Sequence, residues 1–129
     1  MTLGILGLGK IGQRVARIAC GFEMPVIYHD LVEIPEARRY GAIPVSRDEL
    51  LARADVLTIH VDHRASNRHL IDAVALVLMK PEMILINTSR GMVVDHAALA
   101  EFLRHGNRKA LLDVHDPEPI EAGNPLLGM

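Results

Sequence analysis

The stretch LGILGLGKIG, residues 3–12, decides the fold class of this chain. Its first four residues predict a buried strand, and Gly7, Gly9 and Gly12 then form a G-x-G-x-x-G loop. Gly7 permits a tight turn, Gly9 leaves space for a pyrophosphate, and Gly12 lets the next helix pack against the strand. Because a helix N-terminus presents N–H groups and partial positive charge, the stretch predicts a phosphate-binding loop.

An acidic residue after the second expected strand tests this interpretation. Residues 25–29 read as that strand, and Asp30 follows it directly. A carboxylate roughly 20 residues beyond such a loop accepts hydrogen bonds from the adenosine ribose and repels a 2′-phosphate. Taken alone, Asp30 also fits an exposed turn or a helix cap. Together with the loop, it predicts NAD as the cofactor.

Short apolar stretches alternate with amphipathic ones along the rest of the chain. Further strands are expected at residues 43–45, 54–61, 82–87 and 109–114, and helices at 11–21, 35–40, 46–53, 71–79 and 95–105. Ser46 with Glu49 reads as a capping box, and Asp95 as a second helix cap. The alternation predicts an α/β, Rossmann-type fold, a doubly wound parallel sheet of about six strands with helices on both faces. From residue 116 onward we expect an open loop.

Composition narrows the class of protein further. The 129 residues suit one domain, and half of them are hydrophobic while only 3% are aromatic, which predicts an aliphatic core. The net charge of −2 gives no basic face for nucleic acid. The single cysteine fits a reducing compartment, and neither a signal peptide nor a membrane span is recognisable. We therefore expect a cytoplasmic protein with no nucleic-acid or membrane partner.

Charged residues gather where the fifth and sixth expected strands end. Arg90 follows the fifth strand, where a guanidinium could grip a carboxylate in a two-pronged contact. Asp113 and Glu118 follow the sixth, where a carboxylate could orient a catalytic histidine and raise its pKa. Alternatively, Arg90 is a surface arginine that pairs with a nearby acid, and Asp113 and Glu118 belong to a polar loop that closes the domain.

Several segments together resemble one family in order and spacing. Besides the glycine loop, these are Met79-Lys80-Pro81, residues 84–91 with Asn-Thr-Ser-Arg-Gly, Val93-Val94-Asp95, and residues 113–119. They resemble the D-isomer-specific 2-hydroxyacid dehydrogenases, a family that includes phosphoglycerate, glycerate and hydroxypyruvate, D-lactate and formate dehydrogenases. The resemblance runs from Leu3 to about Leu127, and its Asn-Thr-Ser-Arg-Gly segment is far more specific than the glycine loop.

The resemblance implies roles for individual residues. Arg90 would bind the substrate carboxylate and polarise its 2-oxo group, and Glu118 would pair with the catalytic histidine. Asp113 would lie near the nicotinamide carboxamide. Other implied contacts with NAD are made by Lys10, Ile11, His60, Val61, Thr88, Ser89 and Arg90 itself. The implied reaction transfers a hydride between NAD(H) and a small 2-hydroxy or 2-oxo acid, as in phosphoglycerate dehydrogenase, and a homodimer is implied.

The chain departs from the family at its ends. The family's catalytic histidine follows Glu118 in a Pro-His pair that residues 1–129 do not contain, and most of the substrate domain precedes the first strand. We therefore expect residues 1–129 to be an NAD-binding domain, incomplete at its C-terminal end, without the substrate domain, and inactive alone. The alternative is a non-catalytic nucleotide-binding or interaction module left after loss of that domain. The coding sequence on either side distinguishes the two.

One internal segment also departs from the pattern. Residues 62–67, Asp-His-Arg-Ala-Ser-Asn, stand where relatives carry a proline soon after the histidine, which leaves part of the adenosine contact open. The seven histidines, including His60, His63 and His69, match no metal-ligand spacing, so no metal is expected. His115 lies near the expected active edge, but its place before the Glu118 loop argues against a catalytic role.

Overall fold

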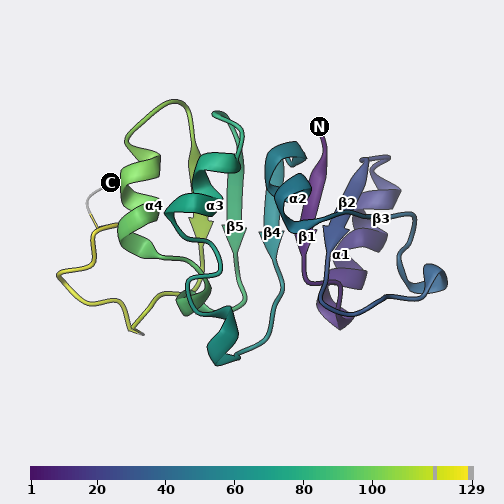
Figure 1. Cartoon of the computed structure of the whole chain (residues 1–129), viewed down its shortest axis with the longest axis horizontal. Helices are drawn as coiled ribbons and strands as arrows, with labels where there is room; N and C mark the ends of the chain where they lie inside the picture. The colour runs from purple at the N-terminus through teal and green to yellow at the C-terminus, as the bar shows by residue number, and fades with distance from the viewer. Residues whose placement is uncertain (118, 128–129) are drawn as a thin grey trace.

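A single parallel sheet organises the molecule. The computed structural model describes residues 1–117 and 119–127 (Figure 1). The sheet has the order β3-β2-β1-β4-β5-β6, with every neighbouring pair parallel. Its strands are β1 (Leu3–Leu6), β2 (Val26–His29), β3 (Ile43–Pro44), β4 (Val56–Ile59), β5 (Ile84–Asn87) and β6 (Lys109–Leu112). This confirms the predicted doubly wound sheet, whose order reverses between β1 and β4.

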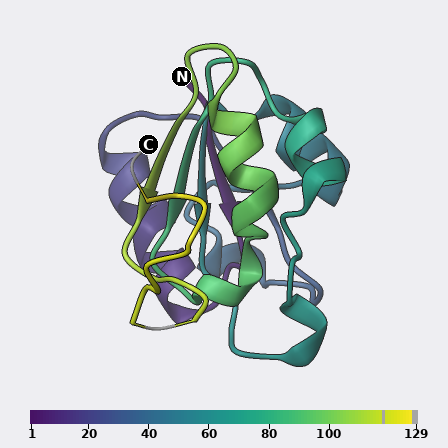
Figure 2. The ribbon, with the colours of Figure 1, turned by 90° about the vertical axis from the view of Figure 1, so that its left-hand side faces the viewer.

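Helices cover the two faces unequally. Figure 2 shows α1 on one face and α2, α3 and α4 on the other. The helices of the described residues are α1 (Lys10–Gly21), α2 (Arg47–Arg53), α3 (Ala73–Leu78) and α4 (His96–Leu103). Three single 3-10 turns are η1 (Glu36–Arg38), η2 (Ala65–Asn67) and η3 (Gly91–Val93). Among the described residues, no helix has both the length and the apolar content to cross a bilayer.

Alternate residues of each strand point to opposite faces, which creates two apolar clusters. Leu57 and Leu85 join the cluster beneath α2, α3 and α4. Ile5 joins the cluster beneath α1, where the small side chains of Ala16 and Ala19 let the helix lie close to the sheet. The core is mainly aliphatic, as the composition predicts, with Phe102 as the aromatic member of the first cluster and Tyr28 of the second.

Most predicted elements are present but shorter than expected. The helix predicted at 35–40 is only the turn η1, which ends at Arg38; the positive φ values of Tyr40 and Gly41, +50° and +84°, follow after it. Ser46 caps α2 by accepting a hydrogen bond from the Glu49 amide, as predicted. The expected reciprocal bond is replaced, because the Glu49 carboxylate pairs with Arg53 at 2.7 Å. After Leu112, the described residues form neither helix nor strand.

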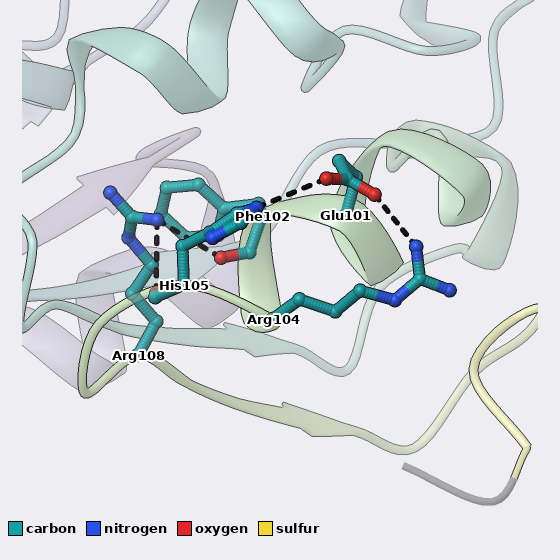
Figure 3. Close-up of polar contacts among 5 residues, drawn as sticks. All are labelled: Glu101, Phe102, Arg104, His105 and Arg108. Atoms are coloured by element: carbon teal, nitrogen blue, oxygen red, sulfur yellow. Dashed lines mark hydrogen bonds and ion pairs between the residues drawn. The ribbon is translucent and has the colours of Figure 1, made fainter.

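The end of α4 is fixed by polar contacts that set the start of β6 (Figure 3). The Arg108 guanidinium donates to the carbonyl oxygens of Phe102 and His105 at 3.1 and 3.0 Å, and it stacks on the Phe102 ring at 4.1 Å. Glu101 pairs with Arg104 and His105, and these contacts lower the pKa of its carboxyl. Cations are favourable at a helix C-terminus, so Arg104 and Arg108 stabilise the end of α4.

Candidate cofactor-binding site

The glycine loop between β1 and α1 has the geometry that its sequence predicts. Gly7 has a φ of +93°, and its amide donates to the carbonyl oxygen of His29 at 2.9 Å. A Cβ added to Gly7 would lie 2.5 Å from the carbonyl oxygen of His60, and one on Gly12 would collide with the Gly7 carbonyl. A Cβ on Gly9 would meet no atom within 4 Å. Two glycines are therefore required by the protein itself, whereas Gly9 faces open space.

The loop leads directly into the N-terminus of α1. Gly9 is the N-cap residue and has no side chain with which to cap the helix. Lys10 and Ile11 are exposed at the first turn, so their backbone N–H groups lie at the open end of the helix. The Gln13 side chain donates to the Leu8 carbonyl oxygen at 3.1 Å and steadies the loop from the helix side. This end of α1 is suited to an anion such as a pyrophosphate.

Asp30 joins the second strand to the loop. One of its carboxylate oxygens accepts a hydrogen bond from the Leu8 amide at 2.7 Å, and the other accepts one from the Val32 amide at 3.1 Å. The turn interpretation and the ribose interpretation are thus both compatible with the geometry. Each oxygen has a second lone pair, so the half-buried carboxylate can still accept from a ligand hydroxyl. The contact with Leu8 holds Asp30 beside the loop.

A cavity of about 600 Å³ lies between the loop and the ends of β2 and β4. Predicted residues Gly7, Gly9, Lys10, Asp30, His60 and Val61 all line it. Leu31, Val32 and Ile34, after β2, form one apolar wall, and the segment after β4 contributes another through Val61, Asp62, Arg64, Ser66 and Asn67. The cavity therefore offers a polar mouth at the glycine loop and an apolar slot beyond Asp30.

His60 extends β4 into this cavity. Its Nε2 lies 2.9 Å from the Thr58 hydroxyl oxygen, and its amide donates to the Leu6 carbonyl oxygen at 2.8 Å. Burial lowers the pKa of the imidazole, so the ring is neutral at pH 7. His60 thus contributes a neutral ring to the lining of the cavity, held by hydrogen bonds of its side chain and its backbone.

The other predicted residues lie at the neighbouring strand ends. Thr88 and Arg90 are exposed after β5, and the Arg90 guanidinium donates to the Ser89 carbonyl oxygen at 2.8 Å. Asp113 is exposed after β6, and its amide donates to the Asn87 carbonyl oxygen at 3.1 Å. These residues share the carboxyl edge of the sheet with the glycine loop but do not line the 600 Å³ cavity. Glu118 lies outside the described residues.

Sequence reasoning missed the residue that organises this second group. Asn87 is fully buried, and its Nδ2 donates to the Arg90 carbonyl oxygen at 3.0 Å. Its Oδ1 accepts from both the amide and the hydroxyl of Ser89, at 3.1 and 2.9 Å. The sequence did contain one signal for this role, because Asn87 is a polar amide at the last position of the otherwise apolar strand β5. Asn87 shapes the turn that presents Arg90 at the sheet edge.

Histidines elsewhere do not converge on a metal site. Within residues 1–117 and 119–127, no group of three or more His, Cys, Asp or Glu side chains is arranged to hold a metal ion. His115 instead meets the ring of His96 edge-on, with centroids 6.1 Å apart. His96 is buried, and its pKa is lowered by that burial and by His115.

Comparisons with known proteins agree with this geometry. Residues 1–129 match the family model for the D-isomer specific 2-hydroxyacid dehydrogenase, NAD binding domain. The chain is 45% identical over 127 residues to glyoxylate reductase of Aeropyrum pernix, covering 97% of the chain and 38% of that relative. It is 45% identical over 131 residues to glyoxylate/hydroxypyruvate reductase B of Pectobacterium atrosepticum, covering 99% of the chain and 41% of that relative.

A solved structure gives the same result. D-lactate dehydrogenase from Aquifex aeolicus, complexed with NAD and lactic acid, matches with a TM-score of 0.85 and 38% identity. The match covers 90% of this chain and 35% of that one. The chain thus spans about two-fifths of the length of the curated relatives named above.

Proposed function

The chain belongs to the D-isomer specific 2-hydroxyacid dehydrogenase family, as its NAD-binding domain, and we propose that it holds NAD(H) for hydride transfer to and from a small 2-oxo or 2-hydroxy acid. The observation that carries this proposal is the contact between Asp30 and the Leu8 amide. That contact sets a carboxylate beside an open phosphate loop, at the mouth of a cavity of suitable size. A ribose carboxylate next to a pyrophosphate site favours NAD over NADP.

The binding roles divide along the sheet edge. The glycine loop and the first amides of α1, at Lys10 and Ile11, would hold the pyrophosphate, and Asp30 the adenosine ribose. His60 and Val61 would contact the adenosine side. Thr88, Ser89 and Asp113 would line the nicotinamide pocket, which lies over the ends of β5 and β6. Their separation from the 600 Å³ cavity fits an extended dinucleotide that crosses the point where the strand order reverses.

The chemical roles fall to two residues. When bound, the nicotinamide ring supplies or accepts the hydride. Arg90 would grip the substrate carboxylate and stabilise negative charge on the reacting oxygen, while Glu118 would hold the histidine that moves the proton. We propose glyoxylate or hydroxypyruvate as the substrate class, because the two named relatives carry those activities. The family resemblance alone suggests a phosphoglycerate-type substrate. Competition assays with the full-length protein show which of these acids it prefers.

Location and assembly are part of the same proposal. We place the protein in the cytoplasm, because its one cysteine, Cys20, is free and exposed, as a reducing compartment allows.

We also propose a homodimer, since Val74 and Val77 on α3 are 71% and 82% exposed. Light scattering of the wild type and a Val77→Glu variant tests the dimer. If Val77→Glu has the same molar mass as a dimeric wild type, α3 does not form the dimer interface.

Calorimetry with NAD and NADP tests the cofactor proposal. We expect the domain to bind NAD, with at least tenfold weaker binding of NADP because Asp30 repels the 2′-phosphate. Asp30→Asn keeps an acceptor for the Leu8 amide but removes the charge, so it should narrow the ratio of the two dissociation constants. Glu33→Ala, an exposed acid nearby, should leave the ratio unchanged. No binding of NAD at millimolar concentration would refute the proposal.

A second experiment separates an enzyme from a binding module. The full-length protein should reduce a 2-oxo acid with NADH, and the isolated domain should not. Binding of NAD by the full-length protein with no turnover of glyoxylate, hydroxypyruvate or phosphohydroxypyruvate would instead support a non-catalytic nucleotide-binding module.

A further inference from the structure

The segment that departs from the family pattern forms an arch beside the cofactor cavity. Its two ends are held by neighbouring elements. The His60 amide donates to the Leu6 carbonyl oxygen at 2.8 Å, and the His69 amide donates to the Met92 carbonyl oxygen at 2.8 Å. Between these anchors, Asp62, Arg64, Ser66 and Asn67 all line the 600 Å³ cavity. The arch therefore forms a wall of the cavity.

Contacts within the arch centre on Asp62. The Asn67 side-chain nitrogen donates to the Asp62 carbonyl oxygen at 2.9 Å and to one carboxylate oxygen at 3.2 Å. The Arg64 guanidinium donates to the other carboxylate oxygen at 2.8 Å. Backbone bonds from Arg64 to Asp62 and from Asn67 to Arg64, at 3.1 and 2.9 Å, complete the turn. Asp62 thus accepts hydrogen bonds from the side chains of both Arg64 and Asn67.

Burial identifies the residue on which the arch depends. Asn67 is only 6% exposed, whereas the side chains of Asp62 and Arg64 are about 60% exposed. A buried side-chain amide that bonds two atoms across a turn fixes that turn more firmly than an exposed ion pair does. Without Asn67, the residues between the two anchors would have to be ordered by the ligand, and that ordering would weaken binding.

The position of the arch indicates which part of the ligand it faces. The glycine loop occupies one end of the cavity, and Asp30 lies next to it. Beyond Asp30, Leu31, Val32 and Ile34 form another wall of the same cavity. A flat adenine ring fits a slot of this kind, with apolar side chains in one wall and a fixed turn in another.

We propose that Asn67, acting through Asp62, is a positioning residue that preforms the adenosine wall of the NAD site. This inference rests on the proposed function, because it assumes that the cavity holds the adenosine half of NAD. The wall is built from hydrogen bonds within residues 62–67, and Asn67 does not need to touch the ligand.

Titration with NAD, 5′-AMP and nicotinamide mononucleotide tests this inference. Asn67→Ala should raise the dissociation constants of NAD and 5′-AMP by the same factor, on the order of tenfold, and leave that of nicotinamide mononucleotide unchanged. Asp62→Ala removes only the longer of the two Asn67 contacts, so it should raise the same two dissociation constants by a smaller factor. Its side chain is exposed, so folding should be little affected. Asp62→Asn keeps an acceptor for Asn67 and should bind as the wild type does. His63→Ala, an exposed residue of the same segment that does not line the cavity, is the matched control.

The outcomes separate the two proposals. If the wild type binds neither NAD nor 5′-AMP, the proposed function fails and this inference with it. If the wild type binds but Asn67→Ala and Asp62→Ala stay within twofold of it, only the inference fails. The inference is also overturned if a variant loses affinity for NAD but not for 5′-AMP. The same holds if a variant loses affinity for all three ligands together with a lowered unfolding temperature.

Discussion

The glycine loop allows stability and binding to be separated with two single-methyl substitutions. Gly7→Ala would set a Cβ 2.5 Å from the His60 carbonyl oxygen on a backbone with a φ of +93°. The backbone strain costs about 1–3 kcal/mol, and the overlap with a strand-end carbonyl adds about 1–3 kcal/mol. The sum of about 2–6 kcal/mol is a large share of the roughly 5–15 kcal/mol that stabilises a domain.

Gly9→Ala is the matched partner of this substitution. Gly9 has a φ of −79°, and a Cβ there meets nothing within 4 Å. We expect a change in unfolding free energy of no more than about 1 kcal/mol. The added methyl would nevertheless occupy the space that we assign to the pyrophosphate, so NAD binding should weaken strongly.

Urea unfolding and calorimetry with NAD measure the two effects. Gly7→Ala should lower the unfolding free energy by at least about 2 kcal/mol, a fall of roughly 8 °C or more in melting temperature for a domain of this size. Gly9→Ala should melt close to the wild type and lose NAD affinity. A Gly7→Ala protein as stable as the wild type, or a Gly9→Ala protein that binds NAD normally, would refute this reading of the loop.

Three further predictions concern the rest of the sheet edge. Asn87→Ala should lower the unfolding free energy by about 2–4 kcal/mol in urea titrations, because it removes a buried amide and leaves its part-buried partners on Ser89 and Arg90 without these hydrogen bonds; a cost below about 1 kcal/mol would contradict this. Arg90→Ala, at an exposed side chain, should raise KM for the 2-oxo acid at least a hundredfold in the full-length enzyme, a far larger effect than on the dissociation constant of NAD. Burial lowers the pKa of His60 and His96 below 6.5, so the unfolded chain binds more protons. Stability should therefore fall as the pH drops below about 6.5, with a shallower fall in His96→Gln, and a pH-independent urea midpoint between pH 7 and 5 would count against it.

Local sequence signals predicted the elements that local chemistry determines. The first turn of α2 follows from Ser46, and that of α4 from Asp95, whose carboxylate accepts from the Ala97 and Ala98 amides. The parallel, doubly wound arrangement followed from the alternation of elements and from the right-handed crossover rule. The roles of Gly7 and Gly12 were also predictable, because the positive φ at Gly7 and the close approach of α1 to the loop at Gly12 both favour glycine.

Contacts between distant residues could not be predicted in the same way. The bond from the Leu8 amide to Asp30 spans 22 positions, and no local pattern indicates that a carboxylate will be used twice. Residues 62–67 read simply as polar, because the pairing of Asp62 with Asn67 depends on a turn that only the closed structure defines. The buried position of Asn87 depends on β4 and β6, which flank the end of β5 on both sides, and this is again a tertiary effect.

The position of β1 in the middle of the sheet has a consequence for the order in which the domain folds. β1 pairs with β2 and with β4, and the Thr2 amide donates to Asp55, a partner 53 positions away. Contacts of such long range form slowly, because a long loop must close first. Gly7 lies against the His60 carbonyl, so the loop takes its final shape only once β4 has docked. During synthesis, a nascent chain that ends before β4 cannot yet hold a nucleotide, although it already contains the entire glycine motif.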